Sequence, residues 1–547
     1  MRLSKPSLQL LLILSLATLA TPTARPAHAN SSPLPALIVY IAADGDDTHD
    51  CATPATRCAT LARGLDQLSE GGEARLAAGS YTGITTVEHA ATIRGGYMLP
   101  DFSPGDAPTI LDGQRQGTTL RIDDAAWARL NRLTITGGLA DSEGAASGRG
   151  GGIYIHGASV TLDHVQVSGN IAADNGSGRG GGIYVRDGEL ALTQSAVTSN
   201  TASLITPAPI SALPNTTLPP PTYPYSLTGS GGGIYALNAR ITIRQSRLAG
   251  NRAIGGDTLA PITLRGWGGG LYAADCTLAA DGAVFAGNDV RAAVGGGGAI
   301  ELFNSWARLR GGEISDNQAG YDGSATSGGG IDVVSGTTTL TDIALRRNAA
   351  SIGSGIALQP SASVVSATAA LTLTNALLAG HGGAALALLP NAGAAHAEVR
   401  YTTLVSNSIG VMAGAGQSIS VTNSLIVGSD IAAQARDGGT VALAYTDRYG
   451  NQQDAAGDVR IGPAGDLALP PGFAIGDAAF RLALGSPLLD RGAPIAGINA
   501  DFEGQPRIAD GDGDGVALPD LGWDELARSA AMFGPNQTLF AQPGQTL

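Results

Sequence analysis

The stretch Gly150–Asn170, GGGIYIHGASVTLDHVQVSGN, contains the pattern that decides the fold of this chain. Its glycine-rich start has the outline of a phosphate-binding loop, but no Gly-Lys-Ser/Thr follows it. The pattern also recurs along the chain. A structural turn can recur in this way, whereas a binding loop is normally a single site. In six copies an asparagine stands nineteen residues after the second glycine of the turn: Gly151 and Asn170, Gly181 and Asn200, Gly232 and Asn251, Gly269 and Asn288, Gly298 and Asn317, and Gly329 and Asn348.

Three further positions are apolar in all six copies. In the first copy they are Ile153, Leu162 and Val167, which stand two, eleven and sixteen residues after the reference glycine. Short runs of alternating apolar residues predict strands rather than helices. A period of this size predicts a solenoid, in which like residues stack at the strand spacing of about 4.8 Å. The sequence therefore predicts an all-β parallel β-helix with turn-forming glycines and asparagines stacked at a corner.

The sequence before the repeats predicts how the solenoid begins. Thr60 precedes three leucines at helical spacing, and Gly71-Gly72 ends that segment. This pattern predicts a short amphipathic helix. We expect it to cap the open end of the solenoid, because terminal units must shield the core.

The first residues have the features of a secretory signal peptide. The positive segment MRLSKPS is followed by the apolar run LQLLLILSLATLA, and Ala27-His-Ala29 offers a cleavage site. We expect cleavage near Ala29 and a secreted or cell-surface protein. The apolar run is too short to span a bilayer, so no transmembrane helix is expected.

Composition excludes several classes of protein. With 79 glycines but no G-X-Y period the chain is not collagen, and 43% hydrophobic residues are too many for a disordered chain. A net charge of −14 argues against a nucleic-acid partner. In an exported chain, Cys51 and Cys58 are close enough in sequence to predict a disulfide. Cys276 is predicted to be a buried free thiol.

Three segments carry a family resemblance: the opening YIAADGDDTHDCATPATRCATLARGLDQL, the repeated GGGIY and SGN, and the ending FRLALGSPLLDRGA to DFEGQPRIADGDGDGVALPDLGWDE. The chain resembles bacterial right-handed parallel β-helix proteins of the pectate-lyase-like superfamily, particularly secreted surface proteins with a C-terminal choice-of-anchor Q domain. Its repeats are also similar to those of polymorphic outer-membrane protein passengers. The family's closing Gly-Ala-x-Glu is replaced here by Gly522-Trp523-Asp524-Glu525.

The resemblance and the repeat together predict the domain organisation. We expect a right-handed β-helix with a short N-terminal capping helix and a small C-terminal β/loop module. The boundaries are a signal peptide at 1–29, an N-terminal segment and cap at 30–84, the β-helix at 85–445, a choice-of-anchor Q-like module at 446–528, and a tail at 529–547 that resembles the start of a further domain.

The stretch between each asparagine and the next reference glycine varies in length. Because these insertions leave the coil at one corner, they predict a loop edge along the solenoid, where such proteins often keep their function. Arg265 and Asp322 on this edge could bind hydroxyls or acids. Four aromatic residues there could stack on sugars: Tyr223, Tyr225, Trp267 and Tyr321. The alternative is a solvent-exposed edge without function.

A second aromatic set lies three residues after the reference glycine. It comprises Tyr154, Tyr184, Tyr235 and Tyr272, and continues as Glu301 and Asp332. Strand alternation places this column on the outer side of the wall. It is either a glycan-binding platform or, as we favour, an aromatic stacking ladder covered by loops.

An outward column twelve residues after the reference glycine offers the best case for catalysis. It contains Asp163, Arg244, Asp281 and Arg310. Enzymes that the chain resembles pair calcium-binding acids with a Lys or Arg base, but the single lysine here, Lys5, is in the leader. His156 and His164 lack a third ligand in the sequence and are predicted to be ordinary surface groups.

The segment Asp510-Gly-Asp512-Gly-Asp514-Gly515 predicts a structural calcium site. Alternating carboxylates supply the oxygen ligands that calcium prefers, and the start matches an EF-hand loop. The bidentate acid expected at the twelfth position is replaced by Leu521, with Asp520 one place earlier.

The sequence thus predicts an exported, non-catalytic β-helix protein. It would bind an extracellular polysaccharide, or another cell-surface glycan or protein, through its loop edge, as a monomer and with no cofactor other than calcium. The alternatives are a polysaccharide lyase or glycoside hydrolase and a passive structural spacer, because the fold does not fix function.

Overall fold

The structure, a computed structural model, describes residues 37–125, 127–140, 148–174, 176–205, 227–255, 264–321, 324–364, 367–391, 393–462, 466–476 and 480–526. The predicted signal peptide, the tail at 529–547, and Tyr223, Tyr225 and Asp322 lie outside these residues. Within them, the strands form one sheet of 36 strands and two sheets of five. No helix in these ranges is both long and apolar enough to cross a bilayer.

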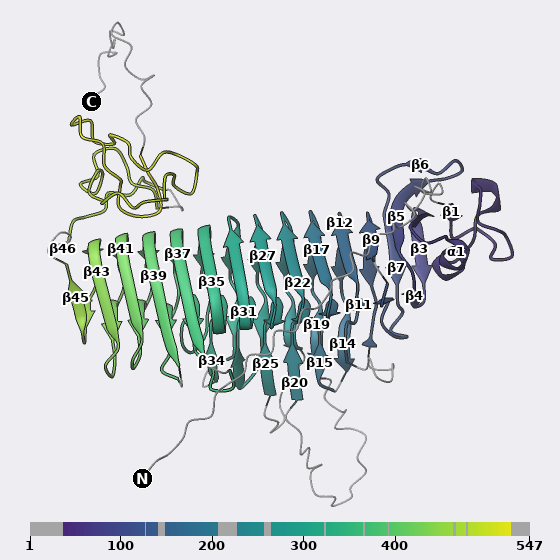
Figure 1. Cartoon of the computed structure of the whole chain (residues 1–547), viewed down its shortest axis with the longest axis horizontal. Helices are drawn as coiled ribbons and strands as arrows, with labels where there is room; N and C mark the ends of the chain where they lie inside the picture. Colours follow the sequence, from purple (N-terminus) through teal and green to yellow (C-terminus); the bar gives the residue numbers. More distant parts are fainter. Residues whose placement is uncertain are drawn as a thin grey trace, which may run out of the picture. The chain divides into compact units, whose positions relative to one another are not determined.

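The N-terminal end contains the predicted capping helix (Figure 1). Helix α1 (Leu61–Gln67) starts after Thr60, whose hydroxyl accepts a hydrogen bond from the backbone N–H of Arg63 at 3.2 Å. The elements around it are β1 (Ile38–Ile41), η1 (Pro54–Thr56), β2 (Gly72–Ala77), β3 (Gly79–Thr82), β4 (Thr85–Val87), β5 (Ala91–Met98), β6 (Ser103–Pro104), β7 (Thr109–Asp112), β8 (Leu120–Asp123), β9 (Trp127–Asn131) and β10 (Thr134–Thr136).

Wall strands recur in each coil that carries the sequence repeat, three in each of the first four coils, two in the fifth and one long strand in the sixth. They are β11 (Ile153–His156), β12 (Ser159–Asp163), β13 (Gln166–Ser168), β16 (Ile183–Arg186), β17 (Glu189–Thr193), β18 (Ala196–Thr198), β21 (Ile234–Leu237), β22 (Arg240–Arg244), β23 (Arg247–Ala249), β26 (Leu271–Ala274), β27 (Thr277–Asp281), β28 (Val284–Ala286), β31 (Ile300–Arg310), β32 (Glu313–Ser315) and β35 (Ile331–Arg346).

The predicted apolar columns are ladders of paired residues in the core. Ile153 pairs in register with Ile183, and Ile183 with Ile234, all fully buried. The other two columns pair in the same way, through Leu162, Leu192 and Ile243, and through Val167, Val197 and Leu248. These parallel pairings confirm the predicted β-helix.

The predicted asparagines form a buried ladder at one corner. The Oδ1 of Asn251 accepts hydrogen bonds from the backbone N–H of Asn200 at 3.1 Å and from its Nδ2 at 3.0 Å. Nδ2 of Asn200 also donates to the carbonyl of Val167 at 3.0 Å. The same pattern joins Asn170 through Asn348, and His381 and Asn407 extend the corner. The hydrogen bonds allow these polar groups to be buried.

The glycines turn the chain, as expected. Gly150 has a φ of 66°, in the left-handed region that favours glycine. At Gly151 an added Cβ would lie 2.4 Å from the carbonyl oxygen of Ile171 and 2.6 Å from that of Gly181. Neighbouring backbones therefore approach closely at this corner.

In the armed coils, residues 138–352, the chain forms extra strands between the asparagine and the next glycine turn. One arm sheet comprises β14 (Ile171–Asp174), β19 (Thr201–Leu204), β24 (Arg252–Gly255), β29 (Asp289–Val290) and β33 (Gln318–Ala319). The other comprises β15 (Gly178–Arg179), β20 (Leu227–Ser230), β25 (Leu264–Trp267), β30 (Val294–Gly296) and β34 (Ala325–Ser327). The arms have a small core of their own that includes Ile254, Leu264 and Val290.

The plain coils, residues 353–467, lack these arm strands in their described parts. Their strands are β36 (Ile356–Leu358), β37 (Thr368–Ala379), β38 (Ala384–Leu388), β39 (Ala394–Val405), β40 (Ile409–Ala413), β41 (Ser418–Val427), β42 (Ile431–Ala435), β43 (Thr440–Tyr449), β44 (Gln453–Ala456), β45 (Val459–Ile461) and β46 (Asp466–Leu467). Parallel pairing extends beyond the predicted 85–445 range, since β1 pairs with β2 and β43 with β45.

The C-terminal residues pack on the outside of the plain coils. Arg507, 1% exposed, donates hydrogen bonds to the side-chain oxygen of Asn375 at 2.8 Å and to the carbonyl of Trp523 at 2.7 Å. Its guanidinium also lies 4.4 Å from the ring centre of Tyr401. Glu525, 3.5 Å from Arg507, is the glutamate of the sequence Gly522–Glu525. The backbone N–H of Trp523 in that segment donates to the hydroxyl of Thr403 in β39 at 3.2 Å, so the segment is part of the contact between the module and the coils.

Candidate functional site

The described part of the loop edge does not form a continuous aromatic surface. Tyr321 follows β33 and is 48% exposed, whereas Trp267 ends β25 and is half-buried. Arg265 is exposed in β25. The edge therefore stays a prediction, and the residues described there are not gathered into a site.

The tyrosine column is a buried stacking ladder. The ring centres of Tyr154 and Tyr184 are 5.3 Å apart, those of Tyr184 and Tyr235 are 5.3 Å apart, and those of Tyr235 and Tyr272 are 5.0 Å apart. Tyr154, Tyr184 and Tyr235 are 7%, 1% and 8% exposed. This geometry agrees with the interpretation as a covered stacking ladder. The alternative, a glycan-binding platform, is wrong for these three rings because they are buried. Strand alternation indicated the correct side of the wall, but it could not show that neighbouring side chains cover that side.

Arginines contribute to this cover. Arg149 and Arg179 place their guanidinium groups 5.9 Å and 5.7 Å from the ring centres of Tyr184 and Tyr235. Arg179 belongs to the arm strand β15. The cation–π contacts and the stacking make the ladder part of the protein's own packing.

The ladder ends in a pair of buried carboxyl groups. Glu301 and Asp332 follow Tyr272 in register and are 3% and 1% exposed. An added Cβ at Gly296 would lie 2.2 Å from Asp332 Oδ2 and 2.7 Å from Glu301 Oε2, so the two groups converge there. Burial, with the neighbouring Asp332, raises the pKa of Glu301 well above its usual value. Burial raises the pKa of Asp332 to about 7, although hydrogen bonds from Ser327 and Gln359 oppose the shift.

The proposed catalytic column is in register but does not converge. Arg244 pairs with Asp281, and Asp281 with Arg310, on successive strands. The Nε of Arg310, however, lies 3.1 Å from Asp342 Oδ2. Asp163 accepts hydrogen bonds from Asn131 and contacts His164 Nδ1 at 2.8 Å. The column therefore forms separate surface contacts rather than a group of acids around one substrate bond.

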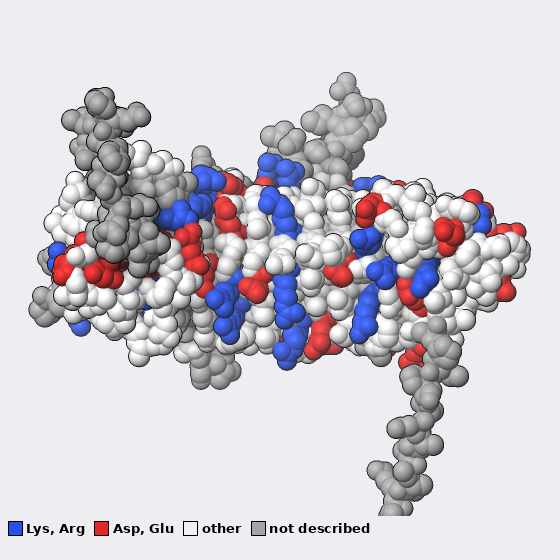
Figure 2. Space-filling view, turned by 90° about the horizontal axis from the view of Figure 1, so that it is seen from above, with Lys and Arg blue, Asp and Glu red and all other residues white. Residues whose placement is uncertain are grey.

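The same wall contains a surface that the sequence analysis missed. We define the arginine–tryptophan face by five exposed residues: Arg240, Arg244, Trp306, Arg308 and Arg310. Trp306 is 47% exposed, and the half-buried Thr277 and Ala279 lie on the strand between β22 and β31. Basic side chains also form bands across the molecule in Figure 2. The sequence feature that could have indicated this face is Trp306, a large aromatic residue in an outward position of its strand.

The carboxylates of the predicted calcium segment group differently in the structure than expected from the sequence. Asp490, Asp510 and Asp512 bring carboxylate oxygens within 4.8 Å of one another. Asp514 lies outside this group, and both oxygens of Asp520 accept backbone hydrogen bonds, from Asp490 and Leu526. Asp490 was missed because it is twenty residues away in sequence. Calcium binding stays a prediction.

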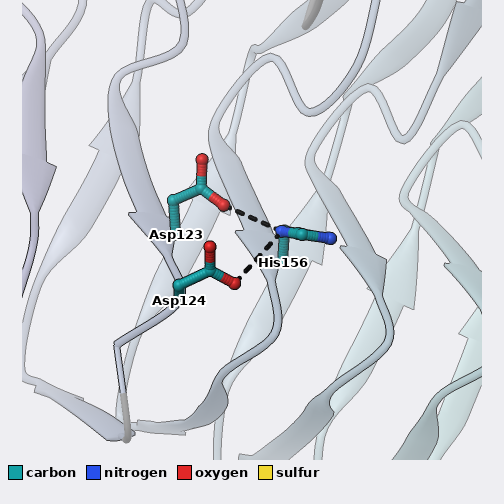
Figure 3. A group of neighbouring side chains, drawn as sticks. All are labelled: Asp123, Asp124 and His156. Atoms are coloured by element: carbon teal, nitrogen blue, oxygen red, sulfur yellow. Dashed lines mark hydrogen bonds and ion pairs between the residues drawn. The ribbon is translucent and has the colours of Figure 1, made fainter.

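A second group of potential metal ligands lies near the start of the armed coils (Figure 3). His156 Nδ1 is 2.9 Å from Asp123 Oδ1 and 3.5 Å from Asp124 Oδ1. Burial raises the pKa of Asp123, but hydrogen bonds from Arg121 and His156 outweigh it and lower the pKa. The sequence analysis did not connect His156 with these two carboxylates because they come from the preceding coil, thirty-three and thirty-two residues earlier.

The cysteines agree with prediction. Cys51 and Cys58 form a disulfide. Cys276 is a buried free thiol, and burial raises its pKa to about 11. A thiol with a raised pKa is a poor nucleophile, so Cys276 has a packing role.

Comparisons with known proteins bear on the fold. No protein-family model matches the chain, and no curated protein matches its sequence. The structure is similar to pectate lyase Pel9A, with 13% identity and a TM-score of 0.34 over 89% of this chain and 96% of that one.

Two further solved structures are similar to this chain. An alginate lyase from Paenibacillus sp. str. FPU-7 has 15% identity and a TM-score of 0.27, over 77% of this chain and 99% of that one. PfbA, a surface adhesin of Streptococcus pneumoniae, has 10% identity and a TM-score of 0.22, over 73% of this chain and 84% of that one. Function must therefore be argued from this chain's own residues.

Proposed function

We propose that this protein is an exported β-helix protein that binds an anionic polysaccharide on its arginine–tryptophan face without cleaving it. The observation that carries the proposal is the position of Trp306, an exposed indole on the strand that also presents Arg308 and Arg310. Export rests on the predicted leader. This face replaces the loop edge as the proposed binding surface because its residues gather on one wall.

The chemistry of the face suits a chain of acidic sugars. An indole stacks on the apolar side of a sugar ring. Guanidinium groups bind carboxylates with two parallel hydrogen bonds. Thr277 and Ala279 are short, so the strand between the arginine-bearing strands β22 and β31 offers little steric obstruction to a bound chain.

The positions of the acids favour binding over cleavage. Glycoside hydrolysis needs two carboxyl groups on either side of an accessible bond. The converging pair, Glu301 and Asp332, is buried beside Gly296, out of reach of a polysaccharide. On the exposed face, Asp281 stands between two arginines of its column.

The test measures retention of residues 30–547 on immobilised polygalacturonate, alginate and a neutral glucan. We expect retention on the acidic polymers that weakens with salt, because exposed charges are screened. Trp306→Ala should weaken binding about tenfold, equivalent to about 1.4 kcal/mol. Tyr321→Ala is the matched control, since Tyr321 is equally exposed but lies on the loop edge.

Each outcome separates the candidate functions. Loss of binding with Tyr321→Ala but not Trp306→Ala would return the site to the loop edge. Ultraviolet-absorbing unsaturated products, or new reducing ends, that disappear with Arg244→Ala would make the protein an enzyme. No retention on any polymer would contradict the proposal and favour a spacer.

A further inference from the structure

His156 lies where two aspartates of the preceding coil reach it. Asp123 ends β8 and His156 ends β11, and the two residues are direct partners in the parallel register. Asp124 follows in the corner with a φ of 52°. One ligand atom from each residue lies within 4.8 Å of the other two, as the converging side chains in Figure 3 show.

The corner of the next coil leaves room for the second carboxylate. Gly157 follows His156, and an added Cβ there would lie 2.5 Å from Asp124 Oδ1. Any other residue at this position would therefore collide with the carboxylate or displace it. A side-chain-free position is what allows Asp124 to turn toward His156.

Two of the atoms that do not converge face groups outside the cluster. Asp123 Oδ2 accepts a hydrogen bond from Arg121 at 2.8 Å. His156 Nε2 faces Asp187 Oδ2 at 3.9 Å, and Asp187 is itself held by Arg186 and by Asn238. The ring nitrogen on the side on which both aspartates lie is Nδ1, which is 2.9 Å from Asp123 Oδ1 and 3.5 Å from Asp124 Oδ1.

We propose that Asp123, Asp124 and His156 bind a divalent transition-metal ion such as Zn²⁺. One imidazole nitrogen and two carboxylate oxygens form a donor set that suits zinc, whereas calcium prefers oxygen ligands alone. Three protein ligands leave coordination positions for water. The side chains of Asp123, Asp124 and His156 are 32%, 80% and 35% exposed, so the ion enters from solvent.

The test is calorimetric titration of the full chain with ZnCl₂, with CaCl₂ in a parallel titration. We expect one zinc site that His156→Ala abolishes and Asp124→Asn weakens at least tenfold. Asp124→Asn guards against a folding artefact, because Asp124 is largely exposed, and circular dichroism should be unchanged.

Two control variants make the result specific. His164→Ala removes a histidine whose Nδ1 contacts one carboxylate, Asp163, at the same short range. Asp510→Asn with Asp512→Asn removes the other group of potential ligands. Both controls should keep the zinc site. Absence of zinc binding, equal binding by His156→Ala, or equal loss with His164→Ala would overturn the proposal and leave a surface ion pair.

Discussion

The armed and plain coils share one core but cover their outer surfaces in different ways. In the armed coils an arm residue, Arg179, lies over the tyrosine ladder, and the arms follow from insertions within each repeat. In the plain coils Asn375 and Tyr401 are contacted by Arg507, more than a hundred residues away in the chain. Groups that cover the wall from within a repeat recur with the sequence period. Groups that come from a distant segment, such as the C-terminal module, cover the wall through a few specific contacts.

The largest effect is expected from a substitution that weakens the packing of the C-terminal module on the plain coils. Arg507→Ala removes hydrogen bonds to the side-chain oxygen of Asn375 and to the carbonyls of Trp523 and Asp524, and leaves these buried acceptors without that donor. An unsatisfied buried acceptor costs about 1–3 kcal/mol, so the loss of three such bonds should cost about 3–5 kcal/mol. Hydrogen exchange should therefore accelerate in β39 and β41 while β16 and β21 stay protected. Equal acceleration in both regions would contradict a local role for the module.

A smaller effect is expected from the ladder common to both regions. Asn251→Ala leaves the backbone N–H and Nδ2 of Asn200 without their acceptor. An unsatisfied buried donor costs about 1–3 kcal/mol, so we expect a loss of about 2 kcal/mol in urea unfolding. Asn304→Ala is the control, since Asn304 is exposed and contacts Asp275 at another corner. Equal losses would show that burial of the ladder is not what matters.

The last effect is a slope of stability with pH, and it concerns the buried pair in the armed coils. Burial raises the folded-state pKa of Asp332 from 3.8 to about 7. Between these values the unfolded state has lost the proton that the folded state keeps. The stability that Asp332 contributes is therefore full below pH 4 and falls as pH rises toward 7, by at most about 1.4 kcal/mol per pH unit.

Asp332→Asn should flatten this part of the stability profile. Asp447→Asn is a control in the plain coils, where burial raises the pKa of Asp447 to about 6. The stability of Asp447→Asn should still fall between pH 6 and 7, because Asp332 is unchanged in that variant. An unchanged profile in Asp332→Asn would show that the pair does not govern this pH range.

Local pattern was sufficient to predict the repeat. Ile153 and Ile183 are interior because alternation and period both place them there. The corner continues at His381 although the residue type changes. Burial lowers the pKa of His381 to about 4, so the imidazole is neutral and can accept a hydrogen bond as an asparagine oxygen does. Its Nδ1 accepts the hydrogen bond from the backbone N–H of Asn348. A search for asparagine alone does not find that position.

The candidate sites were less predictable, because their members come from different coils. Asp123 and His156 are adjacent only through the register of β8 and β11. Asp490 joins Asp510 and Asp512 through the path of the C-terminal module. Tyr184 was assigned to the correct side of the wall, but its burial depends on neighbouring groups that include Arg149.

By itself, the sequence determined the β-helix, its apolar ladders, its asparagine corner, its capping helix and its disulfide. Each follows from periodicity or from residues close together in the chain. Only the tertiary structure decided which outward groups are exposed, which are covered and which converge. The physical reason is that strand alternation fixes the side of a wall on which a residue lies, while burial and proximity depend on coil lengths and on segments packed from far along the chain.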